Sequence, residues 1–291
     1  MASGDAILFP GQGSQHEGMR ALVARERPDL LAAATELVGV DPFLHLNDGT
    51  RYVQPAVFCT SVACWESVKE NAEPMAFAGH SLGEYAALVA ADAVDVYDAL
   101  GLVVLRGRLT QAVAEQVGGG MAALLGVEPA QAYAIAERHG LTVANDNCPG
   151  QSVLSGSHAA LALAQADAVA LGGDARRLAV QGPFHSQQML PAREPFMAAV
   201  SAVRFREPSR PVFSCVAAAP FRDMPRQLAD SLVSGVRWRE VMIALAERGA
   251  TRFIEVAPGA VLSKMVRRTL RGVCYLAVEQ QPLQALAPSV S

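Results

Sequence analysis

Short apolar runs alternate with longer stretches of helical spacing along this chain. Residues 55–70 and 97–117 repeat apolar side chains every three or four positions, which predicts amphipathic helices. An alternation of strands and helices is typical of an α/β fold in which helices cover a mostly parallel sheet. The predicted strands of this sheet are residues 6–9, 75–78, 212–216 and 252–256.

The pattern of apolar positions changes between Gly118 and Phe184. Three consecutive glycines at 118–120 interrupt the helical pattern. A strand, a helix, two strands, a helix and a strand then follow, and this order is typical of a ferredoxin-like fold. The six segments are residues 121–125, 129–139, 141–144, 152–155, 158–171 and 176–180.

We therefore predict an α/β protein in which a small domain interrupts a larger one. Residues 1–117 and 185–281 are expected to form a large α/β-hydrolase-like domain with a mostly parallel sheet. Residues 118–184 are expected to form an inserted ferredoxin-like subdomain, and the cleft between the two is the expected ligand site. The last segment, 282–291, is rich in Pro, Ala and Ser and is predicted to be a poorly ordered tail.

The composition argues against several classes of function. No apolar run approaches the roughly 18 to 20 residues of a membrane-spanning helix, so no membrane span is expected. Residues 1–9 lack the basic start and cleavage signal of a secretory peptide, which favours a cytoplasmic location. A net charge of −4, with only two Trp and five Tyr, gives neither the basic surface nor the stacking platforms typical of nucleic-acid binding.

The five cysteines favour reduced thiols over a disulfide framework. Their number is odd, and none of them lies in a CxxC or Cys/His pattern with the spacing of zinc ligands. We therefore expect mostly buried, reduced side chains and no metal site.

Ser81 lies in a GxSxG pattern formed by residues 79–83. A predicted strand ends just before this pattern and a helix-like stretch follows it, which is the context of a nucleophile elbow. The sharp turn needs small residues on both sides of the serine, and the N–H groups at the start of the helix point at a developing oxyanion. We therefore predict Ser81 to be a catalytic nucleophile.

A serine hydroxyl needs a base within hydrogen-bond reach. His185 follows the predicted insert and should lie at an edge of the expected cleft, so we predict it to be this base. His80 is adjacent to Ser81, and its side chain is expected to point away. The other histidines, in loop, polar or helix-flanking contexts, are His16, His45, His139 and His158.

A glycine-rich loop follows the first predicted strand. Residues 9–15 read FPGQGSQ, and the alternating glycines allow a ligand to approach the backbone closely. The loop lacks the Lys-Ser/Thr pair of a Walker motif and the third glycine of a dinucleotide-binding fingerprint. An oxyanion-hole loop is the better interpretation.

With these motifs the sequence resembles the malonyl-CoA:acyl-carrier-protein transacylase family, which includes free-standing acyltransferases of polyketide pathways. The resemblance covers nearly the whole chain, and the motifs occur in the family order. They are FPGQGSQ at 9–15, QPA at 54–56, GHSLGEY at 79–85, LRGRLTQ at 105–111, GGGMAALLG at 118–126, NDNCPGQSVLSG at 145–156, GPFHS at 182–186, VRW at 236–238 and EVAPGAVL at 255–262.

The resemblance implies transfer of a malonyl group from coenzyme A to the phosphopantetheine thiol of an acyl carrier protein, in a ping-pong reaction through malonyl-Ser81. It implies that His185 is the base and that the backbone N–H groups of Gln12 and Leu82 form the oxyanion hole. In the family a backbone carbonyl orients the histidine, and this carbonyl maps to Arg237. Malonyl-CoA is then a substrate, and no cofactor is bound.

The resemblance also implies the substrate pocket. Arg106 would bind the free carboxylate of the malonyl group, a role that suits a planar, two-pronged guanidinium. Gln54 and Phe184 would line the same pocket. Malonyl-using members carry an aromatic residue at the position of Phe184, whereas methylmalonyl-using acyltransferases often carry a smaller one, so Phe184 favours malonyl.

Three other functions would use the same features in part. A thioesterase that clears stalled acyl groups would use Ser81 and His185 with water as the acceptor, but a buried Arg106 would bring it only a cost. The transferase component of malonate decarboxylase would use the same residues with another carrier. A non-catalytic docking partner has no need for all three side chains.

An acidic enzyme needs a local basic patch to bind an acidic carrier protein. One stretch places four basic residues at i, i+3, i+4 and i+7, so they share one face if the stretch is helical. We predict this face to be the carrier-docking patch, and Arg176 and Arg177 form the alternative. The four residues of the first patch are Lys264, Arg267, Arg268 and Arg271.

Overall fold

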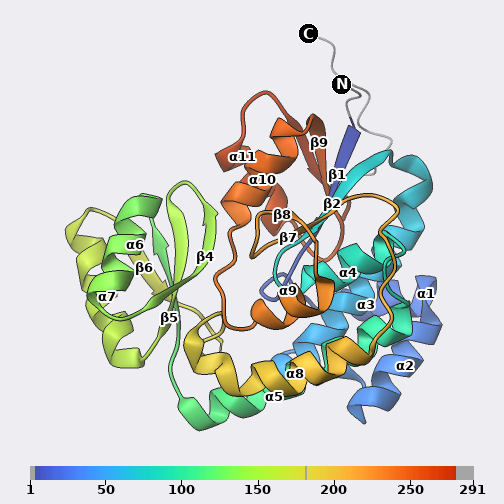
Figure 1. Ribbon diagram of the computed structural model, residues 1–291, viewed down its shortest axis with the longest axis horizontal. Helices are drawn as coiled ribbons and strands as arrows, with labels where there is room; N and C mark the ends of the chain where they lie inside the picture. Colours follow the sequence, from blue (N-terminus) through green and yellow to red (C-terminus); the bar gives the residue numbers. More distant parts are fainter. Residues whose placement is uncertain (1–3, 181, 280–291) are drawn as a thin grey trace.

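The structure, a computed structural model, describes residues 4–180 and 182–279, so the predicted tail at 282–291 lies outside the described residues. Two sheets with helices packed against them organise these residues (Figure 1). Residues from both ends of the chain build the first sheet, and one internal segment builds the second. This arrangement confirms the predicted α/β fold.

The larger sheet has the strand order β10-β9-β1-β2-β7-β8. Its neighbouring strands are parallel except for β7 and β8. The four strands expected from the sequence are confirmed, and the short β8 and the edge strand β10 are additional. The bounds are β1 Gly4–Phe9, β2 Pro74–Gly79, β7 Val212–Ser214, β8 Ala219–Pro220, β9 Ala250–Glu255 and β10 Cys274–Ala277.

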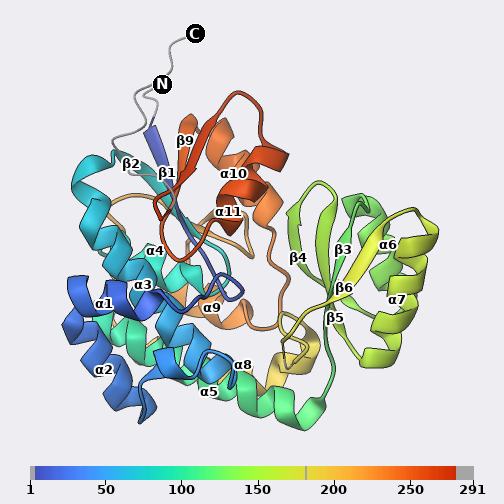
Figure 2. The same cartoon turned by 180° about the vertical axis from the view of Figure 1, so that it is seen from behind.

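Alternation along the central strand β1 separates two cores. Ile7 and Phe9 pack into a core on one face of the sheet, whereas Ala6 and Leu8 pack into a second core on the other face. The helices of the first core are α1 Met19–Glu26, α2 Pro28–Val38, α3 Thr50–Val68, α4 Gly83–Ala90, α5 Val96–Val117, α8 Leu190–Ala202 and α9 Met224–Asp230. Those of the second core are α10 Trp238–Glu247 and α11 Val261–Thr269 (Figure 2).

The two long predicted helices are both present. The helix expected at 97–117 is α5, whose N-terminus is capped by the Asp95 side chain. The helix expected at 55–70 is α3, but it begins earlier, at Thr50. Proline favours the first turn of a helix, so the sequence suggested a start at Pro55, whereas Pro55 lies inside α3.

The smaller sheet has the order β4-β5-β3-β6, and all its strand pairs are antiparallel. This order, with a helix after β3 and another after β5, confirms the predicted ferredoxin-like arrangement. The strands are β3 Gly120–Leu125, β4 Thr142–Cys148, β5 Gln151–Gly156 and β6 Asp174–Arg177, and the helices are α6 Pro129–Arg138 and α7 His158–Ala170.

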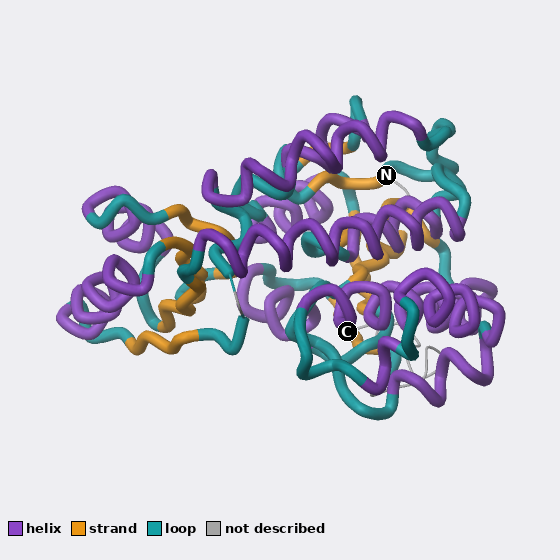
Figure 3. Tube along the Cα trace, turned by 90° about the horizontal axis from the view of Figure 1, so that it is seen from below, coloured by secondary structure: helices purple, strands orange, loops and turns teal. Residues whose placement is uncertain are grey.

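The two faces of the smaller sheet have different neighbours. Ala122 and Leu124 pack against α6 and α7. Met121 and Ala123 point to the opposite face, where they form a small apolar cluster with Val153. Seen from below, this sheet and its two helices occupy one end of the molecule (Figure 3). Among the described residues, no helix is both long and apolar enough to cross a bilayer.

Candidate active site

The turn between β2 and α4 carries Ser81, whose φ of 52° is left-handed. A Cβ on Gly79 would lie 2.0 Å from the carbonyl carbon of Gly83, and a Cβ on Gly83 would lie 2.1 Å from the carbonyl oxygen of Phe9. Only glycine fits at these two positions. The structure thus contains the strand–turn–helix geometry that the GxSxG pattern predicts.

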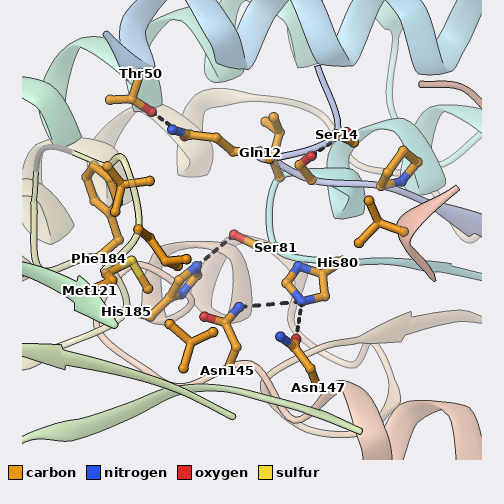
Figure 4. Close-up of a pocket in the computed structure, with 18 of the residues that line it drawn as sticks. Gln12, Ser14, Thr50, His80, Ser81, Met121, Asn145, Asn147, Phe184 and His185 are labelled. Carbon is orange, nitrogen blue, oxygen red and sulfur yellow. Dashed lines mark hydrogen bonds between the residues drawn. The ribbon is translucent and has the colours of Figure 1, made fainter. Parts of the chain in front are cut away.

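His185 reaches Ser81 from the loop before α8. The Ser81 hydroxyl lies 2.8 Å from His185 Nε2, while Nδ1 lies 2.8 Å from the Ser231 carbonyl and 3.1 Å from the Ser234 carbonyl (Figure 4). Carbonyl oxygens only accept, so Nδ1 carries the ring proton and Nε2 accepts from the hydroxyl. Burial, with the Arg106 charge, lowers the pKa of His185 to about 3. The ring is therefore neutral and can accept a proton.

The predicted orienting role of the Arg237 carbonyl is wrong. This carbonyl accepts a hydrogen bond from the Val241 N–H, at 3.0 Å. Arg237 is the N-cap of α10, so the helix itself uses its carbonyl. The carbonyls that orient His185 belong instead to Ser231 and Ser234, which follow α9.

Arg106 projects from α5 to the same point and is only 6% exposed. Its Nη2 donates to the Ser81 hydroxyl at 3.1 Å, and its Nη1 donates to Gln54 Oε1 at 2.7 Å. In the described part of the chain, no carboxylate lies within salt-bridge distance of this guanidinium. Arg106 is therefore a buried positive charge beside the serine, and it can receive an anionic group attached there.

A chain of hydrogen bonds links Arg106 to the glycine-rich loop. Gln54 Nε2 donates to the Thr50 hydroxyl at 2.9 Å, and this hydroxyl donates to Gln12 Oε1 at 2.6 Å. The backbone N–H groups of Gln12 and Leu82 donate to no acceptor within residues 4–180 and 182–279. Both residues line the cavity described next, so these N–H groups can receive an oxyanion.

Ser81, His185 and Arg106 border a cavity of about 310 Å³. The large sheet and its helices supply the polar wall of this cavity. The opposite wall comes largely from the smaller sheet, and Met121 and Phe184 lie on it (Figure 4). The predicted ligand site between the two sheets is therefore present as a cavity.

Two lining residues, Asn145 and Asn147, were missed by the sequence analysis. The predicted strand ended at Ala144, because the following Asn-Asp-Asn run is typical of a loop, but β4 continues to Cys148. His80 Nε2 lies 2.9 Å from Asn147 Oδ1, so the His80 ring turns toward the smaller sheet. The alternation of two amides around Asp146 was the available signal, since alternate positions of a strand share a face.

The predicted docking face on α11 is incomplete. Lys264, Arg267 and Arg268 are exposed on this helix, but α11 ends at Thr269 and Arg271 lies beyond it. Leu270 is extended, so the expected helical spacing does not reach Arg271. Arg268 Nη1 donates to Gln151 Oε1 at 2.9 Å.

The alternative basic patch has internal partners. Arg176 Nε lies 2.9 Å from the Asp174 carboxylate, and Arg177 Nη2 donates to the His158 carbonyl at 3.1 Å. The Asp174 carboxylate offsets the charge of Arg176, and the hydrogen bond to His158 restrains the Arg177 side chain, so the patch offers less to a partner. Elsewhere in the described chain, all five cysteines are unpaired, and no three acidic, His or Cys side chains gather as a metal site.

Comparison with known proteins identifies the class of this site. The chain matches the acyl transferase domain family over residues 7–290, and it therefore belongs to that family. One relative is the malonyl CoA-acyl carrier protein transacylase of Bacillus subtilis (strain 168), which is 36% identical over 302 residues, covering 97% of this chain and 95% of that protein. The resemblance to malonyl-CoA:acyl-carrier-protein transacylases is thereby confirmed.

A much longer relative and two solved structures are also similar to this chain. The polyketide biosynthesis protein ThaF of Burkholderia thailandensis is 36% identical over 91% of this chain, which spans only 24% of that protein. The crystal structure of malonyl-CoA:acyl carrier protein transacylase from Xanthomonas oryzae pv. oryzae has a TM-score of 0.90 at 34% identity, covering 98% of this chain and 99% of that one. A malonyl-transacylase in complex with a type II PKS acyl-carrier protein has a TM-score of 0.90 at 31% identity, covering 97% and 98%.

Proposed function

We propose that this protein transfers a malonyl group from coenzyme A to the phosphopantetheine thiol of an acyl carrier protein. Ser81 Oγ attacks the thioester carbonyl carbon while His185 Nε2 takes the hydroxyl proton. The C–S bond then breaks, the coenzyme A thiol leaves with that proton, and malonyl-Ser81 remains. In the second half, the carrier thiol gives its proton to His185 and attacks the ester, and Ser81 leaves with the proton.

The observation that carries this proposal is the contact between Arg106 Nη2 and the Ser81 hydroxyl, at 3.1 Å. A buried cation beside the acylated atom favours an acyl group that keeps a free carboxylate, and malonyl is such a group. Gln54, which accepts from Nη1, holds the guanidinium in place. Neither an acetyl group nor a plain fatty acyl group would use this charge.

The oxyanion of the tetrahedral intermediate is assigned to the N–H groups of Gln12 and Leu82. Leu82 stands at the N-terminus of α4, where the helix dipole adds to its N–H group. One such donor is typically worth about 10² to 10³ in rate. Hydrogen bonds run from Gln12 through Thr50 to Gln54, which binds Arg106. They support the proposal that the oxyanion hole and Arg106 are positioned together.

The mass of the intact protein after incubation with malonyl-CoA tests the proposal. We expect an adduct of one malonyl group, which a phosphopantetheinylated carrier protein then removes as malonyl-carrier. A thioesterase would instead release malonate without a carrier, and a non-catalytic docking protein would form no adduct. If the adduct passes to the carrier subunit of malonate decarboxylase and not to an acyl carrier protein, the protein serves that enzyme.

For carrier docking we propose the exposed side chains of Lys264 and Arg267 on α11. The opposite side of this helix contributes Leu262 and Met265 to the cavity, so a carrier protein bound to the two charges would lie against a helix of the cavity wall. Arg268 contributes less to docking, because its guanidinium already binds Gln151.

The position of Phe184 supports malonyl over methylmalonyl as the acyl group. Its ring lies on the wall that comes largely from the smaller sheet, next to the base, where it would crowd an α-methyl group (Figure 4). We also assign the protein to the cytoplasm, where coenzyme A thioesters and reduced cysteines are both found.

The domain division of the chain is also proposed. Residues 1–117 and 185–281 are assigned to the large domain and residues 118–184 to the insert. The membership of the sheets supports these bounds, since β3 to β6 fall within the second range and the remaining strands fall outside it.

A further inference from the structure

The chemistry proposed above leaves one buried carboxyl group beside the active site unused. Glu84 lies in the first turn of α4, three residues after Ser81, and is fully buried. Its Oε1 accepts a hydrogen bond from the Cys215 N–H at 2.7 Å. Its Oε2 is buried and makes no hydrogen bond within the described residues. A carboxyl oxygen in that state is costly unless it serves a charge nearby.

Arg106 likewise has a buried polar atom that makes no hydrogen bond among the described residues. Its Nε is buried and has no acceptor in the described part of the chain, and the hydroxyl of Tyr85 is in the same state. Burial raises the pKa of Glu84 to about 7, while the Cys215 N–H and the positive charge of Arg106 oppose this rise. The charge of Arg106, the proposed substrate-binding arginine, thus influences the ionisation of Glu84.

The groups that face Glu84 come from three elements. The positive charge of Arg106 on α5 lowers the pKa of Glu84, as do Ser214 and Cys215 at the end of β7, and Tyr85 is its neighbour on α4. Burial raises the pKa of the Cys215 thiol and of the Tyr85 hydroxyl, so both stay neutral at pH 7. His185, with its pKa lowered to about 3 by burial, stays neutral as well. Glu84 is then the member of this group that titrates near neutrality.

We propose that Glu84 is the counter-charge of Arg106 in the empty site, and that it takes up a proton when the substrate's carboxylate reaches Arg106. The proton comes from solvent and adds to the Glu84 carboxylate. Where Glu84 is ionised in the empty site, the guanidinium therefore faces one negative charge before and after binding, first that of Glu84 and then that of the acyl group. This inference rests on the proposed function, because it requires an acyl group with a free carboxylate.

The exchange of charges gives malonyl transfer a dependence on pH that acetyl transfer lacks. The malonyl carboxylate brings a second negative charge to the site and raises the pKa of Glu84 further. Below pH 7 Glu84 is already neutral, so malonyl enters without a proton. Above pH 7 malonyl entry must draw a proton, and its advantage over acetyl falls by up to about tenfold per pH unit. An acetyl group has no carboxylate and leaves Glu84 unchanged.

The test is the ratio of single-turnover acylation rates with malonyl-CoA and acetyl-CoA, measured from pH 6 to 9. Both substrates use Ser81, His185 and the same coenzyme, so their common titrations cancel in the ratio. We expect the wild-type ratio to fall by about threefold or more between pH 6.5 and 8.5. In Glu84→Gln, which keeps an acceptor for the Cys215 N–H, the ratio should be flat and should exceed the wild-type value at pH 8.5.

Glu255→Gln is the matched control. Glu255 is also buried, and its carboxylate accepts from the N–H groups of Val261, Leu262 and Ser263 at the start of α11. It takes no part in the proposed exchange. A loss of structural support slows both substrates alike, so the wild-type fall of the ratio with pH should persist in this variant.

The outcomes separate this inference from the proposed function. No acylation of the wild-type protein by malonyl-CoA would reject the function itself. Acylation with a flat wild-type ratio, or a fall that persists in Glu84→Gln, would reject the role of Glu84 alone. If Glu84→Gln does not fold, proton uptake by the wild-type protein in weak buffer at pH 7.5 decides: malonylation should take up more protons than acetylation, and an equal uptake overturns the proposal.

Discussion

The two walls of the cavity are built on different principles. On the wall of the large sheet, Ser81 and His185 both have left-handed backbones, with φ of 52° and 58°, and Ser81 sits between glycines that accept no Cβ. On the wall of the smaller sheet, Met121 and Val153 are ordinary positions of regular strands. Strained backbone persists only where the surroundings fix it. The first wall therefore fixes reacting atoms, and the second supplies a surface whose side chains can change size.

The largest effect is expected on the fixed wall. Ser81→Ala should abolish the malonyl adduct, because within residues 4–180 and 182–279 no other hydroxyl lies on His185 Nε2. His185→Ala should slow acylation by about two to four orders of magnitude, the usual effect of losing a general base. The mass of the intact protein measures the adduct in Ser81→Ala, and rapid-quench kinetics measure the acylation rate of His185→Ala. Ser152→Ala, a buried serine of β5, should acylate normally, and an adduct that persists in Ser81→Ala would overturn the assignment.

The next effect concerns the charge on the same wall. Arg106→Ala should lower malonyl transfer by about 30-fold or more, since removing one partner of a buried charge pair costs about 2 to 5 kcal/mol. Acetyl transfer should suffer less. The two rates are compared in one coupled assay, with Arg108→Ala as an exposed control on α5. An equal loss with both acyl groups would show that Arg106 is structural.

On the second wall we expect a change of selectivity with little loss of rate. Phe184→Ala removes the ring that faces an α-methyl group, and one such carbon is typically worth at least about tenfold in discrimination. The ratio of methylmalonyl to malonyl transfer should rise by about that factor. Competition between the two coenzyme A thioesters measures it. Phe205→Ala, a half-buried phenylalanine just past α8, should leave the ratio unchanged; a similar rise there would contradict the specificity role.

The smallest effect is expected outside both walls. Reversing Lys264 and Arg267 to Glu should raise the KM for the carrier protein by a few-fold at low salt and weaken its salt dependence, because exposed charges act mainly on encounter. Self-acylation by malonyl-CoA should be spared. Arg271→Glu, beyond the end of α11, is the control. Unchanged carrier kinetics in the double variant would remove α11 as the docking site.

The sequence predicted best where one short motif specifies both geometry and chemistry. Ser81 and His185 meet as expected, because a GxSxG turn after a strand has few other conformations. The prediction failed for Arg237, where the start of α10 consumes the expected carbonyl, and for Arg271, where α11 ends too early. Helix ends depend on caps and on tertiary contacts, which periodicity does not contain.

Tertiary structure also overruled local preference in β4. Asn145 and Asn147 favour a loop by propensity, yet pairing with β5 keeps them in a strand that lines the cavity. Glu84 was visible in the motif GHSLGEY, but nothing in its spacing indicated a buried carboxyl near Arg106. Such a group becomes apparent only when the helices that carry the two residues are packed together.

The order of strands in the two sheets has a consequence for biosynthesis. The strands of the smaller sheet pair with one another within residues 120–177, and only a single bridge from Asn145 to Val236 involves a later segment, whereas β1 must wait for β9, near the other end of the described chain. At about 5 to 20 residues per second, the ribosome needs roughly 4 to 16 s to make the segment from Arg177 to Glu255. During this time the smaller sheet can already fold, while the apolar β1 and β2 still lack a neighbour on one edge. We therefore expect the nascent large domain, and not the insert, to be the part that depends on chaperones.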